Sequence, residues 1–390
     1  MDKIDFSCPD KNVLVLASGN REYNLVTKDY SWSPLAGKKI KVYGLRESYG
    51  NRQRSGDIND PLKFYVRWKK GHSEQSFFAK KVKFQGWAGS SFNIADHLAS
   101  LGAKNVTLAV FVKDGPELKD LHDYCKEKGI SFIPLWASDT GRTFVFEDDM
   151  NADSVVCMQK PSEIDTTYNL DKLLSQKWDV IISSSTPDNE DILRMNIAIF
   201  EKNPNAIRSL MPSLSLINNE KEKIKKLFKK LIVLTEIFQV NDIEAGRYLN
   251  LNEEGDNKPI ERRELVLKLV EDLEIPVVIV TMGKEGAAVV GMHLDVPNDE
   301  DKYIYQKAFR ENWVIKTTVG SGDAFHSGFM RIYMQAANNY HEKCLKLAAR
   351  IGAELAIRNA CVWGGNMSKD ETKRLSKKDF QKIVEYCKIS

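Results

Sequence analysis

Long apolar runs are missing from this 390-residue chain, whose N-terminal region holds only a five-residue apolar stretch at 13–17. A helix that spans a membrane needs roughly eighteen or more consecutive apolar residues. The sequence therefore predicts no membrane helix and no membrane partner. The first residues also lack the pattern of a secretory signal, so we expect a cytoplasmic protein.

Cysteine and net charge are also scarce. The six cysteines form no CxxC pair, which argues against a disulfide framework and against a zinc site bound through sulfur. The net charge is only +3, because 57 basic and 54 acidic residues are interspersed along the chain. Such a balance gives no electrostatic reason to expect a nucleic-acid partner.

Short β-branched runs alternate with segments of helical periodicity. Residues Phe92, Ala95 and Leu98 share one face of a predicted helix, and another helix is expected near 117–128. The runs expected as strands are 12–17, 105–112, 178–185, 231–235 and 277–283. Alternating strands and helices indicate an α/β fold with a doubly wound, mainly parallel sheet in a three-layer, Rossmann-like arrangement.

One segment departs from this alternation. Between about 38 and 84, clusters of β-forming residues are separated by glycines, which predicts two or three hairpin strands outside the main sheet. We therefore divide the chain into a main domain of 12–36 and 84–390 and an inserted β lid of 37–83.

The stretch VGSGDAF places glycines immediately before a predicted helix that begins near Asp323. The first N–H groups of a helix have no partner within it, and Gly320, Ser321 and Gly322 let an anion approach them closely. Asp323 at a helix start is most often a cap, and a general base is the alternative.

VGSGDAF resembles the Gly-Ala-Gly-Asp signature of the ribokinase/phosphofructokinase-B (PfkB) family of carbohydrate kinases. Three further segments resemble motifs of this family in the expected order: GWAGSSFNIADHLASLGA at 86–103, VNDIEAGRYL around Asn241 and Glu244, and VTMGKEGA around Thr281. Four motifs in order, covering roughly 13–361, form a specific pattern. The resemblance implies a ribokinase-like fold and an enzyme that uses ATP and Mg²⁺.

The resemblance also implies roles for individual residues. Asp323 would be the catalytic base, with N–H groups at Gly320, Ser321 and Gly322 stabilising the transferred phosphoryl group. Asn241 and Glu244 would act near the ATP phosphates, with Glu244 holding Mg²⁺ through water. The remaining implied contacts are Thr281, Gly283 and Gly286 to ATP, and Glu22, Gly89 and Asn93 to the acceptor.

Each role has a structural alternative. Asn241 with Glu244, and Asn93 alone, are residue types that commonly cap helices. Trp87 either narrows the acceptor pocket or simply packs, and His326 beside the base is expected to pack.

Three positions depart from the family pattern. Glu22 stands where the family usually has an aspartate, Ala88 replaces a glycine, and Thr317 replaces the aspartate that in some members helps to bind a monovalent cation. The last departure argues against activation by potassium.

The expected activity is the ATP-dependent phosphorylation of a hydroxyl group on a sugar or a sugar phosphate. A nucleoside kinase is the alternative of the same chemistry, with Trp87, Phe92 and Phe144 available near a base, and a catalytically silent relative is the other. The lid is rich in basic residues, which either protect a strand edge or bind an acceptor phosphate. Its arginines are Arg46, Arg52, Arg54 and Arg67. The lid is also a possible homodimer contact.

Overall fold

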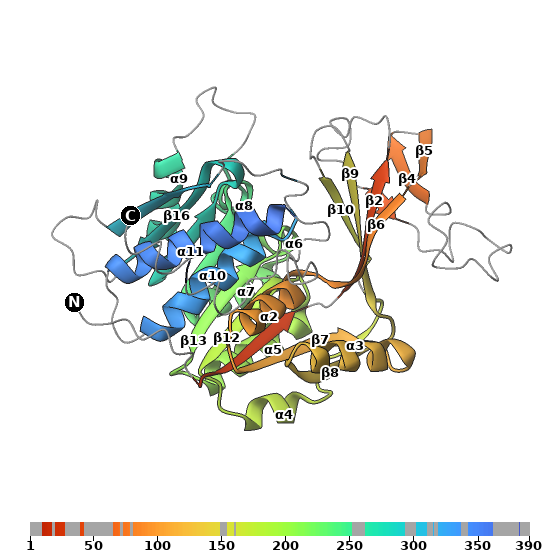
Figure 1. Cartoon of the computed structure of the whole chain (residues 1–390), viewed down its shortest axis with the longest axis horizontal. Coiled ribbons are helices and arrows are strands. Elements are labelled where there is room, and N and C mark those ends of the chain that lie inside the picture. The colour runs from red at the N-terminus through yellow and green to blue at the C-terminus, as the bar shows by residue number, and fades with distance from the viewer. Residues whose placement is uncertain are drawn as a thin grey trace, which may run out of the picture.

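The computed structural model describes residues 10–17, 20–27, 40–42, 65–70, 73–78, 81–148, 154–159, 161–251, 262–292, 302–309, 315, 319–336, 342–361 and 382. Its largest sheet has ten strands in the order β11-β8-β7-β1-β12-β13-β14-β15-β16-β17 (Figure 1). These strands are β1 Asn12–Ala17, β7 Asn105–Val112, β8 Ser131–Ala137, β11 Ile164–Asp165, β12 Val180–Thr186, β13 Ile207–Pro212, β14 Ile237–Asn241, β15 Val277–Thr281, β16 Gly286–Gly291 and β17 Tyr303–Lys307.

The seven strands from β8 to β15 in this order are parallel, and the strands beyond them, β11, β16 and β17, pair antiparallel. The chain builds outwards from β1 through β7 to β8, and then returns to β12 and proceeds in the opposite direction. The predicted doubly wound, mainly parallel sheet is therefore confirmed. Its switch point lies between β1 and β12, where the carboxyl ends of such strands usually bind ligands.

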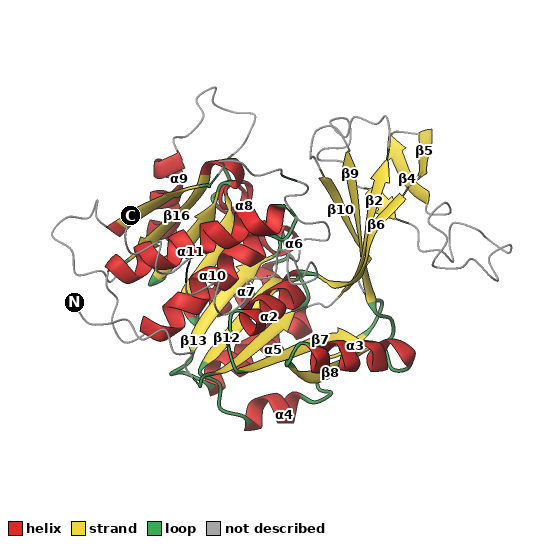
Figure 2. Ribbon diagram, viewed as in Figure 1, coloured by secondary structure: helices red, strands yellow, loops and turns green. Residues whose placement is uncertain are grey.

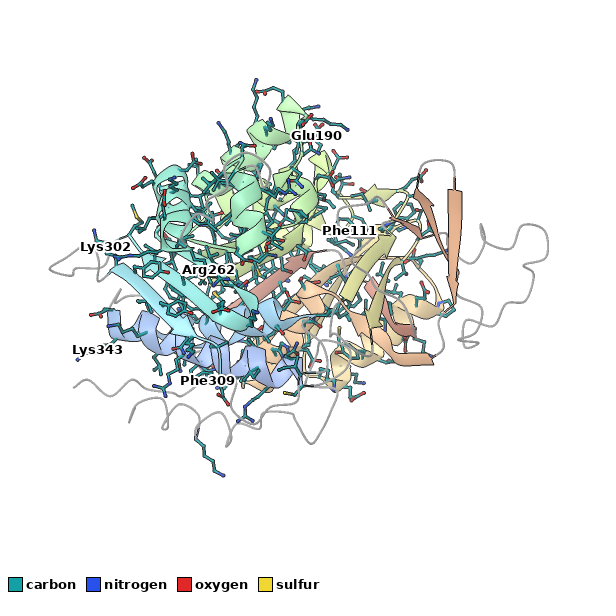
Figure 3. All side chains as sticks on the ribbon, turned by 90° about the horizontal axis from the view of Figure 1, so that it is seen from above. Phe111, Glu190, Arg262, Lys302, Phe309 and Lys343 are labelled. Carbon is teal, nitrogen blue, oxygen red and sulfur yellow. The ribbon has the colours of Figure 1, made fainter. Side chains whose placement is uncertain are left out.

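Two hydrophobic cores lie on the two faces of this sheet. Along β1, Val13 and Val15 join the core shared with α2, α10 and α11, whereas Leu14 and Leu16 join the core shared with α5, α7 and α9. Each buried Val or Leu side chain contributes about 1.5–3 kcal/mol to folding. The two helical layers are separated in Figure 3, where Glu190 of α5 and Lys343 of α11 lie on opposite sides of the sheet.

The helices of the two layers have the bounds α2 Ser90–Ser100, α3 Pro116–Glu127, α4 Leu170–Ser175, α5 Glu190–Lys202, α6 Leu214–Ile217, α7 Glu222–Val233, α8 Asp242–Tyr248, α9 Arg262–Leu273, α10 Ser321–Ala336 and α11 Glu342–Ala360. A 3₁₀ turn, η4, covers Gly283–Glu285. Within the described ranges, none of the helices is long and apolar enough to cross a bilayer.

The predicted strand at 231–235 is wrong, because α7 continues to Val233 and the strand is β14, Ile237–Asn241. Ile224, Phe228 and Leu231 recur at helical spacing and are buried on one side of α7. Val233 is 83% exposed, which a central strand would not allow.

Two smaller sheets stand beside the main one (Figure 1). The order β10-β9-β2-β6 forms the first and β3-β4-β5 the second, and Figure 2 shows only strands in this part of the described structure. Their strands are β2 Asn20–Thr27, β3 Ile40–Val42, β4 Tyr65–Lys70, β5 Ser73–Phe78, β6 Lys81–Ala88, β9 Gly141–Asp148 and β10 Ser154–Gln159.

Hairpin strands outside the main sheet are therefore present as predicted, but the four-stranded sheet also takes β2, β9 and β10 from outside 37–83. The division into 12–36 with 84–390 and 37–83 stays a proposal. Of the lid arginines, Arg46, Arg52 and Arg54 lie outside the described residues, and Arg67 lies in β4.

Helices α10 and α11 pack closely against each other at Gly352. A Cβ atom on Gly352 would lie 2.8 Å from the carbonyl oxygen of Phe325 and 3.1 Å from its ring. We expect Gly352→Ala to lower the free energy of unfolding by about 1–3 kcal/mol, because such overpacking forces the backbones apart. Urea denaturation measures this change.

Gly246 in α8 provides the matched control, since a Cβ there would meet nothing within 4 Å. Gly246→Ala should raise the free energy of unfolding by up to about 1 kcal/mol through helix propensity alone. Equal gains for both variants would show that α10 and α11 do not need the glycine.

Candidate active site

Asp323 lies in the first turn of α10, at the carboxyl edge of the main sheet. Gly320 precedes the helix with a φ of 74°, a left-handed conformation that suits glycine, and its carbonyl oxygen accepts the first helical hydrogen bond from Ala324 at 2.9 Å. The N–H groups of residues 321–323 therefore begin the helix and point out of its positive end. Asp323 is only 7% exposed.

Asn93 of α2 contacts Asp323 directly. Its Nδ2 donates a hydrogen bond of 2.9 Å to Asp323 Oδ2, and the two residues are 230 positions apart in the chain. Burial raises the pKa of the Asp323 carboxyl above its ordinary value, and hydrogen bonds from Asn93 and Ser90 offset part of that rise. The structure therefore brings together the residues predicted as base and acceptor contact.

A serine cluster that the sequence analysis missed adjoins this pair. Ser90, at the start of α2, shares a hydrogen bond of 2.7 Å with Ser185. Ser185 has a φ of 45°, which is uncommon for a residue with a side chain, and it lies at an irregularity of β12. The sequence signal is the polar run SSST at the carboxyl end of an apolar strand.

Asn241 and Glu244 form a reciprocal helix cap at the start of α8. Asn241 Oδ1 accepts from the Glu244 N–H at 2.8 Å, and Glu244 Oε2 accepts from the Asn241 N–H at 2.9 Å. The capping alternative is thus confirmed for this pair, and it leaves Glu244 Oε1 outside the box.

The negative charge of Asp323 also affects the pKa of the Glu244 carboxyl. Burial is the largest cause of the raised pKa of Glu244, and the nearby carboxylates of Asp323 and Asp242 raise it further. Two carboxylates that repel each other at one edge of a sheet suit a divalent cation with oxygen ligands, so these side chains fit Mg²⁺. Across the described residues, no cluster of three or more His, Cys, Asp or Glu side chains occurs that could hold a metal ion.

Thr281 is the last residue of β15, and Gly283 and Gly286 lie in the turn that follows it and at the start of β16. Thr281 ends the strand and pairs with Asn241 of β14, so these two positions are neighbours across the sheet. Gly283 is exposed with a φ of 50°. The presence of glycine at 286 has a structural explanation that does not involve ATP, because a Cβ atom there would lie 2.0 Å from the carbonyl oxygen of Gln306 in β17.

Of the predicted acceptor contacts Gly89 and Glu22, the structure describes the first fully and the second only through its backbone. Gly89 precedes α2 with a φ of 101°, and its carbonyl oxygen accepts from the Asn93 N–H at 3.0 Å. Glu22 pairs through its backbone with Gly86 of β6 and Thr143 of β9, and its side chain lies outside the described structure. Thr317 is also outside the described residues.

Trp87 packs. It is 4% exposed, stacks on Phe92 with ring centroids 5.7 Å apart, and donates a hydrogen bond of 2.9 Å from Nε1 to Asp120 Oδ2. The alternative in which Trp87 packs is the one the structure bears out, and neither Trp87 nor Phe92 presents an open ring face to a ligand in this arrangement.

Comparison with known families decides the assignment. The model of the pfkB family of carbohydrate kinases matches residues 72–361. The chain belongs to this family. The predicted resemblance is therefore confirmed, and membership of the pfkB family makes the protein a kinase with ATP as the expected co-substrate.

Solved structures of several kinases share the fold. Ribokinase from Giardia lamblia superposes with a TM-score of 0.63 at 15% sequence identity, covering 98% of this chain and 100% of that one. Phosphofructokinase-2 from Escherichia coli, in complex with potassium, gives 0.62 at 13%, covering 97% and 99%. A nucleoside kinase from Methanocaldococcus jannaschii gives 0.58 at 14%, covering 96% and 98%. A search of curated protein sequences finds no match.

Proposed function

We propose that the protein phosphorylates a hydroxyl group of a sugar or a sugar phosphate with ATP, using Asp323 as the general base. The observation that carries this proposal is the hydrogen bond between Asn93 Nδ2 and Asp323 Oδ2 at the N-terminus of α10. It places a side chain suited to bind acceptor hydroxyls, a buried carboxylate and a set of helix N–H donors at one point.

The transfer step uses these groups in a defined order. The acceptor oxygen attacks the γ-phosphorus of ATP while its proton passes to the Asp323 carboxylate, and the bond to the bridging oxygen breaks to release ADP. The N–H groups at 320–323 stabilise the charge on the transferred phosphoryl group. The raised pKa of Asp323 suits a base, because a group with an ordinary carboxyl pKa accepts a proton less readily.

We assign Asn241, Glu244, Thr281 and Gly283 to the nucleotide side of the site. When bound, Mg²⁺ would neutralise charge on the ATP phosphates, and Glu244 would hold its water shell. The doubt about a monovalent cation rests on Thr317, which lies outside the described residues, and it stays a prediction.

Two alternatives have different structural support. The packing of Trp87 against Phe92 removes two of the three aromatic rings that a nucleoside acceptor would need, and the third, Phe144, has no described side chain. A silent relative would not need a buried base paired with Asn93. The proposal therefore keeps a sugar-type acceptor, a cytoplasmic location on compositional grounds, and the lid as a possible homodimer contact.

The test is an acceptor panel read by ADP release. Matched pairs of each sugar with and without a phosphate group, together with nucleosides, are assayed on the wild type, with Asp323→Asn as the blank for contaminating kinases. We expect acceptor-dependent ADP release with one sugar-type class. Preference for a nucleoside would establish the alternative acceptor, and the absence of acceptor-dependent ADP release by the wild type in every class would support the silent relative.

Glu244→Gln tests the magnesium assignment. The amide oxygen of glutamine can still accept from the Asn241 N–H, so the helix cap persists while the negative charge is lost. We expect the Mg²⁺ concentration for half-maximal rate to rise by about tenfold, as replacement of an outer-sphere group does. The acceptor KM should change little.

Asp242→Asn is the matched control, because this acidic residue lies in the same first turn of α8. It should leave the Mg²⁺ requirement within about twofold. A large change in acceptor KM for Glu244→Gln, with an unchanged Mg²⁺ requirement, would move Glu244 to the acceptor side.

A further inference from the structure

A chain of three buried polar side chains lies directly behind the start of α10. Gln239 Nε2 donates a hydrogen bond of 2.9 Å to the carbonyl oxygen of Gly322. Gln239 Oε1 lies 2.8 Å from His326 Nδ1, and His326 Nε2 lies 3.1 Å from Ser209 Oγ. The chain joins strands β13 and β14 to the first two turns of α10, and His326 is completely buried.

The donor and the acceptor of each hydrogen bond in this series follow from the group at one end, the carbonyl of Gly322. A carbonyl oxygen only accepts, so the Gln239 amide must present its NH₂ group to Gly322 and its oxygen to His326. His326 must therefore carry its proton on Nδ1, and its bare Nε2 accepts from the Ser209 hydroxyl. Burial lowers the pKa of His326 to about 3, so the ring is neutral in this position.

The bond to Gly322 acts on the peptide that contains the Asp323 N–H. The carbonyl of Gly322 and the N–H of Asp323 belong to one planar trans peptide and point in opposite directions. Holding the carbonyl oxygen from the side of β14 therefore fixes where the Asp323 N–H points. That N–H lies at the open end of α10, among the donors that the proposed mechanism directs at the phosphoryl group.

We infer that Gln239, His326 and Ser209 form a positioning chain that orients the Gly322–Asp323 peptide for phosphoryl transfer. None of the three touches the reacting atoms, and His326 acts through Gln239 instead of exchanging protons. This inference rests on the proposed function, because it assigns a purpose to the anion-binding geometry. The sequence signal was two polar residues inside apolar segments, in IFQVN and in DAFHSGF.

A kinetic cycle tests the chain. Gln239→Met keeps the length of the side chain but removes both hydrogen bonds, and we expect kcat to fall by about tenfold, short of the full loss of an anion-hole donor. The KM values for ATP and acceptor should stay within about twofold. Ser209→Ala removes the donor at the far end and should lower kcat by a few-fold. The double variant should have the kcat of Gln239→Met alone, because once Gln239 is lost, Ser209 no longer has an effect on the Gly322–Asp323 peptide.

Tyr333→Phe is the matched control for stability. Tyr333 is also buried in α10, and its hydroxyl donates a hydrogen bond of 2.8 Å to Glu236 Oε1, just before β14, far from the glycines. It should cost a similar free energy of unfolding without changing kcat. Equal kcat values for Gln239→Met and Tyr333→Phe would overturn the inference, and so would multiplicative losses in the double variant.

The protonation state provides a test that is independent of catalysis. Selective ¹⁵N labelling of the six histidines, with His326→Gln to assign the signal, should show a neutral ring protonated on Nδ1 between about pH 5 and 8. Protonation on Nε2, or titration in this range, would overturn the chain. Should Asp323→Asn keep its turnover, the proposed function fails while this spectrum still reports on the chain. Should Asp323→Asn be inactive and the cycle show no coupling, the chain alone fails.

Discussion

Asp323→Asn should lower kcat by about a hundredfold or more, with the fold and the affinity for ATP preserved. The substitution removes the group that accepts the acceptor's proton, and loss of a positioned base has effects of this order. The side-chain amide oxygen introduced by the substitution can still accept from Asn93 Nδ2, so the geometry of the pair persists. Steady-state kinetics with the acceptor found by the panel, and calorimetric titration with ATP, measure the two quantities.

Stability separates this outcome from a folding defect. The buried Asp323 carboxyl has a raised pKa, so it ionises less readily in the folded protein than in the unfolded chain. Its ionisation therefore costs folding free energy, a cost that is absent below the unfolded pKa and reaches its full size above the folded pKa. A neutral amide lacks this cost, and the Asp323→Asn variant should be at least as stable as the wild type at neutral pH.

The kcat/KM of the wild type should depend on pH through the ionisation of the Asp323 carboxyl. A general base acts in its charged form, so the kcat/KM of the wild type should fall as the pH drops through the raised pKa of Asp323. The acid limb should lie above the ordinary range of an aspartate and should disappear from the residual activity of Asp323→Asn. Turnover of the variant near the wild-type value would remove Asp323 from the mechanism.

The sequence singled out residues of the candidate site, but it did not predict the contacts between them. Asp323 and Asn93 were each assigned from local motifs, but the bond between them joins α10 to α2 across 230 positions, and no local pattern reports such a pairing. The Gln239 and His326 bond is missed for the same reason. Polar residues within apolar segments mark buried hydrogen bonds, but they do not identify the partner.

Strand β14 shows a second limit. Residues 231–234 and 237–240 are two short, mainly apolar runs, and periodicity over so short a run does not separate the end of a helix from a strand. The prediction therefore gave a strand at 231–235, where α7 ends at Val233, and it missed the actual strand at Ile237–Asn241. Strands β2, β9 and β10 were not identified, because their segments are mixed in polarity and their pairing spans distant parts of the chain.

Gly322→Ala should lower kcat on the order of a hundredfold, the loss seen when an anion-hole contact is removed. A Cβ on a helical residue tilts towards the N-terminus of its helix, which here is the opening that the proposed phosphoryl group must approach. The methyl group would keep that group from the N–H donors of residues 321–323. The measurement is kcat with saturating ATP and acceptor.

Stability makes this prediction specific to the reaction. Gly322 does not adopt the left-handed conformation of Gly320, and the nearest atom to an added Cβ is Gln239 Nε2 at 3.9 Å, an ordinary contact. Alanine also favours a helix over glycine by about 1 kcal/mol, so Gly322→Ala should be as stable as the wild type or more so, like Gly246→Ala. A variant that gains stability but loses turnover indicates that glycine is kept at 322 for the approach of a ligand. Full turnover in the stable variant would mean that no reacting group comes close to this part of the backbone.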